Sequence, residues 1–378
     1  MEKSTKNFLA ACSVIIGTCI GAGILGIPYV ASQSGFSIAA FYLIFLGGII
    51  LLVNLYLGET ALRTKQNHQL VGYAKKYIGK GGGKLMKFAF VFGIYSAIIA
   101  YLVGVGDSFS FLIFGNLNYS LVFGVIFGLF ISFLLWRGIK FLKVYEKMGV
   151  LAIVILISTI FFNFVWRVEY SNLDYTNFQY ALVPFGVILF ALLSETSIPI
   201  ASRILKNEKH ILKKTIIVSS IISIIFYLLF TFTVLGFSGF VTPEIATFTL
   251  GAFFIILGVF TMFTSHISLG NALMENFEID EGFRKKKSWI LSSFAPVLVY
   301  IFISFFDFFS FTRVLSIGGV VSGGLIAVLS LFIVKKAKIK GERKPEYSIP
   351  LNWIVIIFAI LVFGIGVVRE VLSIFGKA

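Results

Sequence analysis

The sequence predicts an all-α polytopic membrane protein, because its composition, its hydropathy and the spacing of its apolar runs agree. Hydrophobic residues make up 58% of the 378 residues and charged residues only 13%, whereas a soluble domain has about 45–50% apolar and about 25% charged residues. The mean hydropathy is +0.98. Inside a bilayer, long apolar runs must satisfy their own backbone groups as helices. Water-soluble enzymes, nucleic-acid-binding proteins and disordered proteins are therefore poor interpretations.

About eleven apolar runs are long enough to cross a hydrocarbon core, which takes roughly 20 helical residues. In order along the chain they cover residues 8–31, 36–62, 85–113, 119–136, 145–165, 179–202, 211–236, 248–272, 288–306, 309–334 and 350–372. Before the third run, an amphipathic stretch from His68 to Ile78 predicts a short surface helix. No separate soluble domain is predicted, so residues 1–378 are expected to form a single integral membrane domain.

The distribution of basic residues predicts the orientation. With eleven spans and a cytoplasmic N-terminus, 28 of the 32 Lys and Arg residues fall on the cytoplasmic side. They are Lys3 and Lys6 and those in the segments 63–87, 137–147, 203–214, 284–287 and 335–344. Cytoplasmic loops are enriched in Lys and Arg. We therefore expect a multi-pass cell-membrane protein with an extracellular C-terminus, and the net charge of +15 needs no nucleic-acid partner.

Two of the predicted spans contain residues that interrupt helices. The first holds Gly17, Gly21, Gly23, Gly26 and Pro28, and Gly and Pro are costly inside a helix. The sixth holds Pro184, Gly186 and the run Ser194-Glu195-Thr196-Ser197-Ile198-Pro199. An alternative for the first span alone is close helix packing through its G-x-x-x-G pair.

Interruptions at matching positions in two halves are typical of an inverted repeat with its binding site between the halves. The predicted repeats cover about 8–165 and about 179–334, and residues 350–372 form one additional helix. A helix opened at mid-membrane exposes amides on one side of the break and carbonyls on the other. Freed amides suit a carboxylate, and freed carbonyls suit an ammonium group or a metal cation. The pattern therefore favours a zwitterionic amino acid as the ligand.

The interrupted first span resembles that of a known family. The run from Gly17 to Pro28, Gly-Thr-Cys-Ile-Gly-Ala-Gly-Ile-Leu-Gly-Ile-Pro, resembles the amino acid/auxin permease family of the amino acid-polyamine-organocation superfamily, particularly its aromatic amino acid permease branch. Ser197-Ile198-Pro199 with Arg203, and Thr264-Ser265 with Leu269-Gly270-Asn271-Ala272, resemble further motifs of that family. The resemblance implies the leucine-transporter fold and cation-coupled uptake of an amino acid.

The resemblance also implies roles for particular residues. The carbonyls of Thr18 and Cys19 would hold the substrate ammonium, and the amides of Ala22 and Gly23 would hold its carboxylate. The positions that form a sodium site in sodium-coupled relatives are here Gly17, Ile20, Thr261, Thr264 and Ser265. Lys147, near the cytoplasmic start of the fifth span, resembles a lysine whose ammonium replaces sodium in proton-coupled relatives.

Ionisable and aromatic residues inside the spans give further candidates, because a charge in a bilayer is costly and is commonly functional. Glu195 lies on the interrupted sixth span and is predicted either to handle a proton or contact substrate, or to cap broken backbone. His266 is a second titratable candidate, and its alternative is an ordinary core histidine. Glu59 is expected to pair with Arg63 at the inner edge. Candidates for gating or for lining the substrate pocket are Asp107, Tyr95, Tyr101, Phe190 and Ser194.

Together these features predict a secondary transporter that imports a neutral or aromatic amino acid by alternating access. Proton symport is favoured because Glu195, His266 and Lys147 are titratable, and sodium symport is the alternative. Glu195 stands where aromatic permeases tend to have a different polar residue, which weakens the prediction of an aromatic substrate. An ion channel would be expected to show a pore-lining repeat or a charged ring, and an enzyme would need clustered catalytic groups. Neither pattern is visible, and no cofactor or metal is expected.

Overall fold

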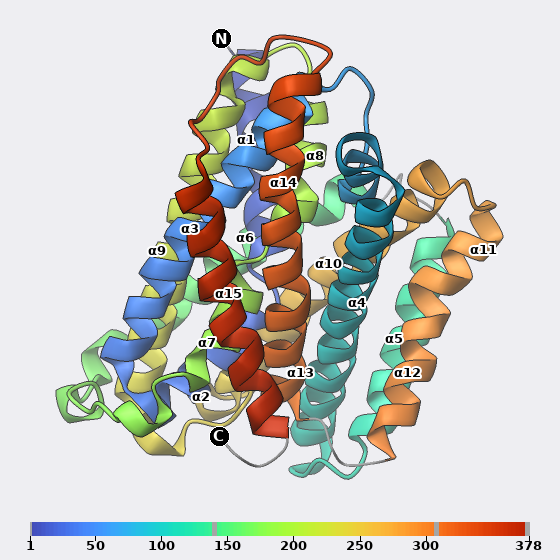
Figure 1. Ribbon diagram of the computed structural model, residues 1–378. Coiled ribbons are helices and arrows are strands. Elements are labelled where there is room, and N and C mark those ends of the chain that lie inside the picture. Colours follow the sequence, from blue (N-terminus) through green and yellow to red (C-terminus); the bar gives the residue numbers. More distant parts are fainter. Residues whose placement is uncertain (1, 138–141, 306–309, 375–378) are drawn as a thin grey trace.

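The computed structural model describes residues 2–137, 142–305 and 310–374, and within these ranges the regular structure is helical, without strands. The α-helices are α1 (Glu2–Cys19), α2 (Gly23–Ser34), α3 (Phe36–Arg63), α4 (Leu70–Phe114), α5 (Ser120–Arg137), α6 (Leu142–Phe164), α7 (Val183–Leu192), α8 (Ile198–Ile204), α9 (Leu212–Ser238), α10 (Ala252–Glu275), α11 (Lys285–Trp289), α12 (Ala295–Ser304), α13 (Phe311–Gly318), α14 (Gly324–Lys340) and α15 (Trp353–Ile374). Figure 1 shows them as one elongated bundle, with the two ends of the chain at opposite ends of it.

The predicted fold class is confirmed. Among the described residues, nine helices are long and apolar enough to cross a membrane, and the bent pair of α1 and α2 makes a tenth. The predicted fifth span, 145–165, coincides with α6, whose second half and the 3-10 turn after it form a shorter apolar helix, Ile153–Arg167. Each of the eleven predicted runs therefore coincides with a helix or with consecutive helices.

The first span is broken where its glycines gather. α1 ends at Cys19, α2 begins at Gly23, and the two axes are bent by 48°. Ala22 stands at the N-cap of α2 without a side-chain hydrogen bond to the helix. Since the first N–H groups of a helix lack an intrahelical partner, the break exposes backbone donors inside the bundle, as the sequence predicts.

The sixth span is also broken, between α7 and α8. Leu193 and Ser194 separate α7 from a single 3-10 turn, Glu195–Ser197, after which α8 begins with Pro199 in its first turn. The Ser194 carbonyl accepts a hydrogen bond from the backbone N–H of Ser197 at 3.0 Å. Asn54 donates to the Ser194 hydroxyl from α3 at 3.0 Å. The break is thus held open by specific bonds and is not a frayed helix.

The two broken spans pack on each other at the centre of the bundle. α2 packs against α7, and α1 packs against α8. In the most apolar 18-residue stretch of the span Val183–Ile204, 83% of the residues are buried. The corresponding share is 33% in α5 and in α15. Burial on all sides lets unpaired backbone groups face protein and cavity instead of lipid.

The predicted surface helix is present at the start of α4. Residues from Leu70 onward are helical, but Gly79 has φ +81°, a conformation that favours glycine. The chain therefore bends there before the third span begins.

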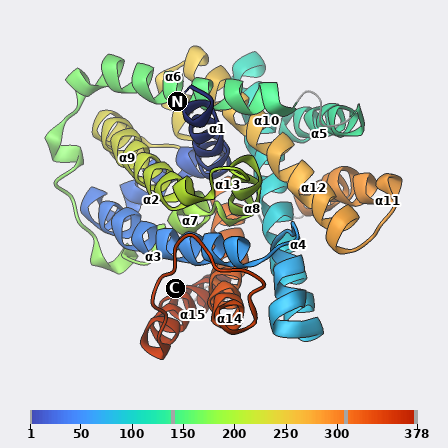
Figure 2. The same cartoon turned by 90° about the horizontal axis from the view of Figure 1, so that it is seen from above.

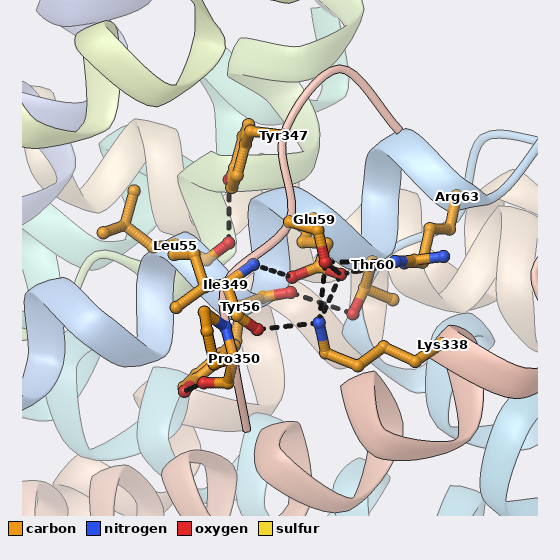
Figure 3. Close-up of polar contacts among 10 residues, drawn as sticks. Leu55, Tyr56, Glu59, Thr60, Arg63, Lys338, Tyr347, Ile349 and Pro350 are labelled. Atoms are coloured by element: carbon orange, nitrogen blue, oxygen red, sulfur yellow. Dashed lines mark hydrogen bonds and ion pairs between the residues drawn. The ribbon is translucent and has the colours of Figure 1, made fainter. Parts of the chain in front are cut away.

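A polar segment ties the last helix to α3. The linker between α14 and α15, residues 341–352, lies over the end of α3 (Figure 3). Fully buried Glu59 accepts hydrogen bonds from Lys338 (2.7 Å), from Arg63 (2.9 Å) and from the backbone N–H of Ile349 (2.9 Å). The predicted pairing of Glu59 with Arg63 is confirmed, but the carboxylate is buried under the linker and not at an open interface. Figure 2 shows α15 beside α14 at the edge of the bundle.

Candidate functional site

A small cavity of about 40 Å³ lies where the two broken spans meet. At about 10–15 Å³ per water molecule, it holds about three waters. Its walls come from the first span, α4, the sixth span, α10 and the Gly319–Gly323 turn before α14. The lining residues are Thr18, Cys19, Gly21, Phe90, Gly93, Ile94, Ala97, Tyr101, Phe190, Leu193, Glu195, Thr196, Leu269, Ser322 and Ile326.

Four of the predicted substrate residues border this cavity, namely Thr18, Cys19, Tyr101 and Phe190. The Thr18 hydroxyl donates to the Val14 carbonyl at 2.8 Å, so this side chain forms its hydrogen bond within α1. The other three predicted substrate residues, Ala22, Gly23 and Ser194, are not part of the lining.

Gly23 has a packing role in this structure. A Cβ atom built on Gly23 would lie 2.6 Å from the Cα of Ala191. α2 and α7 therefore approach so closely that no larger residue fits between them. Gly23→Leu is the simplest test of the backbone site, but it would also push the two broken spans apart. A loss of binding in this variant would therefore not show that the Gly23 amide binds substrate.

The Cys19 carbonyl, predicted to meet the substrate ammonium, already has two donors. It accepts hydrogen bonds from the backbone N–H of Gly21 at 3.1 Å and from the Tyr227 hydroxyl at 2.7 Å. The same hydroxyl lies 2.6 Å from the carbonyl oxygen of Ala191 at the end of α7. Fully buried Tyr227 on α9 thus stands between backbone carbonyls of both broken spans.

Glu195 is the acidic residue of the cavity wall. It is buried, and the backbone N–H groups of Ser194 and of Glu195 itself lie near its carboxyl. Among the described residues it forms no salt bridge with a basic side chain. The carboxyl therefore caps broken backbone and also faces the cavity, so the geometry accommodates both predicted roles.

Tyr101, which lines the cavity, and Ser265 both lie against the first break at Gly21. A Cβ atom built on Gly21 would lie 2.6 Å from the Tyr101 hydroxyl and 3.1 Å from the Ser265 hydroxyl. Gly21 is therefore the glycine that lets these two polar groups reach the unwound backbone. The Ser265 hydroxyl donates to the Gly17 carbonyl at 3.3 Å.

Of the predicted coupling-ion residues, Gly17 and Ser265 are thus brought together. The hydroxyls of Thr261 and Thr264 donate to carbonyls of their own helix, α10, at 2.8 and 3.0 Å. Ile20 lies in the first break. The side chain of Lys147 lies outside the described residues.

His266 does not border the cavity. Its ring centroid lies 6.0 Å from that of Tyr101 and 5.5 Å from that of Phe127. Its Nδ1 is buried without a hydrogen-bond partner among the described residues. The residue is packed between α4 and α5, as expected for a core histidine.

The ends of the central helices on the side of the chain's N-terminus are joined by polar contacts. Arg203 of α8 pairs with Glu275 at the end of α10 at 2.7 Å, and Gln69 donates to the same carboxylate at 3.1 Å. Asn7 of α1 donates to Glu208, just beyond α8, at 3.1 Å. These bonds connect α8 of the sixth span to α10, and α1 of the first span to the segment just after α8.

A second, larger pocket of about 610 Å³ opens at the opposite end of the bundle. Predicted gating residue Asp107 lines it, together with Glu244 and Tyr300. It shares no lining residue with the central cavity. Predicted candidate Tyr95 faces away from both, and its hydroxyl donates to the Leu291 carbonyl at 2.5 Å.

Sequence reasoning missed Tyr227, Asn54 and Glu275. Tyr227 lies in an otherwise apolar run, Ile224-Ile225-Phe226-Tyr227-Leu228. Since a buried tyrosine hydroxyl usually finds a hydrogen-bond partner, its place in mid-span was a usable signal. Nothing in the sequence pairs Asn54 with Ser194 or Glu275 with Arg203.

Two broken spans packed around a central cavity are an arrangement typical of secondary transporters. The fold is similar to that in the crystal structure of MhsT in complex with L-phenylalanine, with a TM-score of 0.70 and 13% sequence identity, over 96% of this chain and 98% of that one. Residues 4–242, more than half of the chain, match the tryptophan/tyrosine permease family. The chain belongs to that family, so the resemblance of the first span to aromatic amino acid permeases is confirmed.

Two curated relatives are similar over part of their length. Glutamine transporter 2 of Aliivibrio fischeri is 26% identical over 237 residues, which are 59% of each chain. Tyrosine-specific transport system 1 of Haemophilus influenzae is 26% identical over 228 residues, which are 59% of this chain and 56% of the relative. The similarity thus spans less than two thirds of either relative.

Proposed function

We propose that the chain is a secondary transporter that imports an amino acid by alternating access. The observation that carries the proposal is the cavity between the two breaks, which is lined by Thr18, Cys19 and Gly21 of the first span and by Glu195 and Thr196 of the sixth. The cavity holds about three waters in this structure, so an amino acid occupies it only when the two broken spans move apart. The closed inner contacts around Glu275 and the separate outer pocket are consistent with a site that opens to one side at a time.

The substrate is proposed to be a neutral amino acid, aromatic or with a polar side chain. Its ammonium group meets the Thr18 and Cys19 carbonyls, and its carboxylate meets the amides of Ala22 and Gly23. Tyr227 has two acceptors, so its hydroxyl keeps the Ala191 carbonyl when the ammonium takes the Cys19 carbonyl. Names of the relatives support both side-chain types, since one is a glutamine transporter and the other is tyrosine-specific.

Proton symport is the favoured coupling, with Glu195 as the proton-binding group. It is the titratable carboxyl in the cavity wall, whereas His266 lies off the cavity. Sodium symport is the alternative, and the contact between the Gly17 carbonyl and the Ser265 hydroxyl favours it. The cytoplasmic N-terminus and extracellular C-terminus remain part of the proposal, supported by the distribution of basic residues.

Counterflow in proteoliposomes tests transport itself. Vesicles are loaded with unlabelled phenylalanine, tyrosine, tryptophan or glutamine and diluted into a trace of the labelled compound. A transporter accumulates the label transiently, whereas a channel does not. Absence of counterflow with every common amino acid, for protein that is folded and inserted, contradicts the proposed function.

Imposed gradients and the Glu195→Gln variant test the coupling. We expect a pH gradient to drive uptake without sodium, and E195Q to keep counterflow exchange but lose gradient-driven accumulation. Glu278→Gln, at an exposed position beyond α10, is the matched control. If uptake instead needs a sodium gradient and is abolished by Ser265→Ala, the transporter is sodium-coupled and proton symport is wrong.

A further inference from the structure

A groove of about 1180 Å³ runs along the face of α4 that points away from the central cavity. Its walls are formed by α4, α12, α13 and two phenylalanines beyond α10, Phe277 and Phe283. On α4, Phe88, Val91 and Tyr95 line the groove, whereas Phe90, Ile94 and Ala97 line the cavity. The groove and the cavity share no lining residue, so the groove is a separate site.

The groove has the length and the surface of a lipid site. Along α4 its lining extends from Lys84 to Ile99, which at 1.5 Å per residue is about 22 Å. That is most of a hydrocarbon core of about 30 Å. Phe88 of its lining is 54% exposed, so its mouth opens to the acyl chains of the bilayer.

Two lysines lie at one end of the groove, and Arg313 of α13 is the other charged residue of its lining. Lys84 and Lys87 line it there, at the start of the third span. Lys87 and Lys75 share one carboxylate, that of Glu281, at 2.6 and 2.7 Å, which leaves a net positive charge. Lys84 is exposed and forms no ion pair within the described part of the chain.

A further cation lies on the groove wall at the same end. The Lys287 ammonium lies 3.9 Å from the ring centroid of Phe283, which lines the groove. Lys287 ends the basic run Arg284-Lys285-Lys286-Lys287. Basic pockets between transmembrane helices on the cytoplasmic side bind anionic lipid headgroups. Zwitterionic lipids offer such a cluster no net charge.

We infer that this groove binds an anionic phospholipid of the cytoplasmic leaflet. Lys84 and Lys87 hold the phosphate, and an acyl chain lies along Phe88, Val91 and Val299 toward the middle of the bilayer. The occupant is a phospholipid and not a soluble phosphate compound, because the charged end continues directly into an apolar channel of membrane depth. The inference does not depend on which amino acid the central cavity binds.

Native mass spectrometry of the purified full chain in detergent tests this inference. The protein is titrated with dioleoyl phosphatidylglycerol and, separately, with dioleoyl phosphatidylcholine. We expect tighter binding of phosphatidylglycerol. Since each Lys near a membrane surface contributes about 1 kcal/mol, Lys84→Gln is expected to weaken that binding about fivefold. Lys213→Gln, an exposed lysine on α9, is the matched control and is expected to change nothing.

A second variant tests the apolar part of the site. Val91→Trp fills the groove, so it is expected to lower the binding of both lipids, whereas Lys84→Gln acts on phosphatidylglycerol alone. Equal affinity of the wild type for the two lipids overturns the inference, as does an equal loss in the Lys84 and Lys213 variants. Unchanged binding in Val91→Trp places the lipid outside the groove and also overturns it.

Discussion

The hydroxyl oxygen of Tyr227 lies 2.7 Å from the carbonyl oxygen of Cys19, so a side chain of α9 reaches the broken end of α1. The Ala191 carbonyl, at the end of α7, lies 2.6 Å from the same hydroxyl. A hydroxyl has one proton and therefore donates to one of these carbonyls at a time. Tyr227 therefore supplies one hydrogen bond that is shared between a carbonyl of each broken span.

Tyr227→Phe is expected to lower the free energy of unfolding by about 0.5–1.5 kcal/mol, because one buried hydrogen bond is lost while the Cys19 carbonyl keeps the Gly21 N–H and the Ala191 carbonyl keeps the Cys19 thiol. Thermal and denaturant unfolding in detergent measure this change. Tyr119→Phe is the control, since Tyr119 is 46% exposed and packs through its ring. Equal stability of Y227F and wild type would show that the link between the breaks contributes nothing.

Glu59→Gln is expected to destabilise the protein by about 3–5 kcal/mol, because two basic side chains lose a buried carboxylate. The linker over Glu59 contains Arg343 and Lys344, so trypsin is also expected to cleave it faster. Unfolding and limited proteolysis measure the two effects. Glu169→Gln, at an exposed position, is the control. A variant as resistant to trypsin as the wild type contradicts the assigned role of Glu59.

Glu275→Gln is expected to favour opening of the bundle at the end where Arg203 and Glu275 pair, because Arg203 loses its partner on α10. Cys19 borders the cavity and is a free thiol, so its alkylation reports the opening. In a Cys12→Ser background we expect alkylation up to about fivefold faster, since a partly exposed ion pair is worth about 0.2–1 kcal/mol. Glu278→Gln is the control. Slower or unchanged labelling in Glu275→Gln speaks against a closing role for this pair.

Glu281 gives a pH-dependent contribution to stability. Burial acts to raise the pKa of its carboxyl, but hydrogen bonds and charges of Lys75 and Lys87 outweigh burial, so that pKa lies below the ordinary glutamate value. A group with a depressed folded-state pKa stabilises the protein above its unfolded pKa and loses that contribution as pH falls through the folded one. The melting temperatures of wild type and Glu281→Gln are therefore expected to differ at neutral pH and to converge in acid.

The Lys75→Gln variant supplies the control for Glu281. Introduced into the wild type, Lys75→Gln is expected to cause part of the pH-dependent difference in melting temperature. Introduced into Glu281→Gln, it is expected to cause no further pH-dependent difference, and a double-mutant cycle measures this. A difference in melting temperature that stays constant down to acid pH contradicts the ion-pair account.

Several features of the candidate site followed from the sequence because they are local. Gly17, Gly21, Gly23 and Pro28 destabilise a helix wherever it lies, so the break after Cys19 could be predicted. The proximity of Gly17 and Ser265 followed from a resemblance to a family in which these positions meet.

The amino-acid sequence by itself determined the all-helical membrane fold, the positions of its spans and the two interruptions, because hydropathy and helix propensity act over a few neighbouring residues. Only the tertiary structure decided which residues meet. It set Tyr227 against Cys19, and it buried Glu59 beneath a linker about 290 positions later in the chain. It also packed His266 away from the cavity that Glu195 lines. These contacts depend on how helices rotate and pack, and no periodicity within one helix specifies its partner.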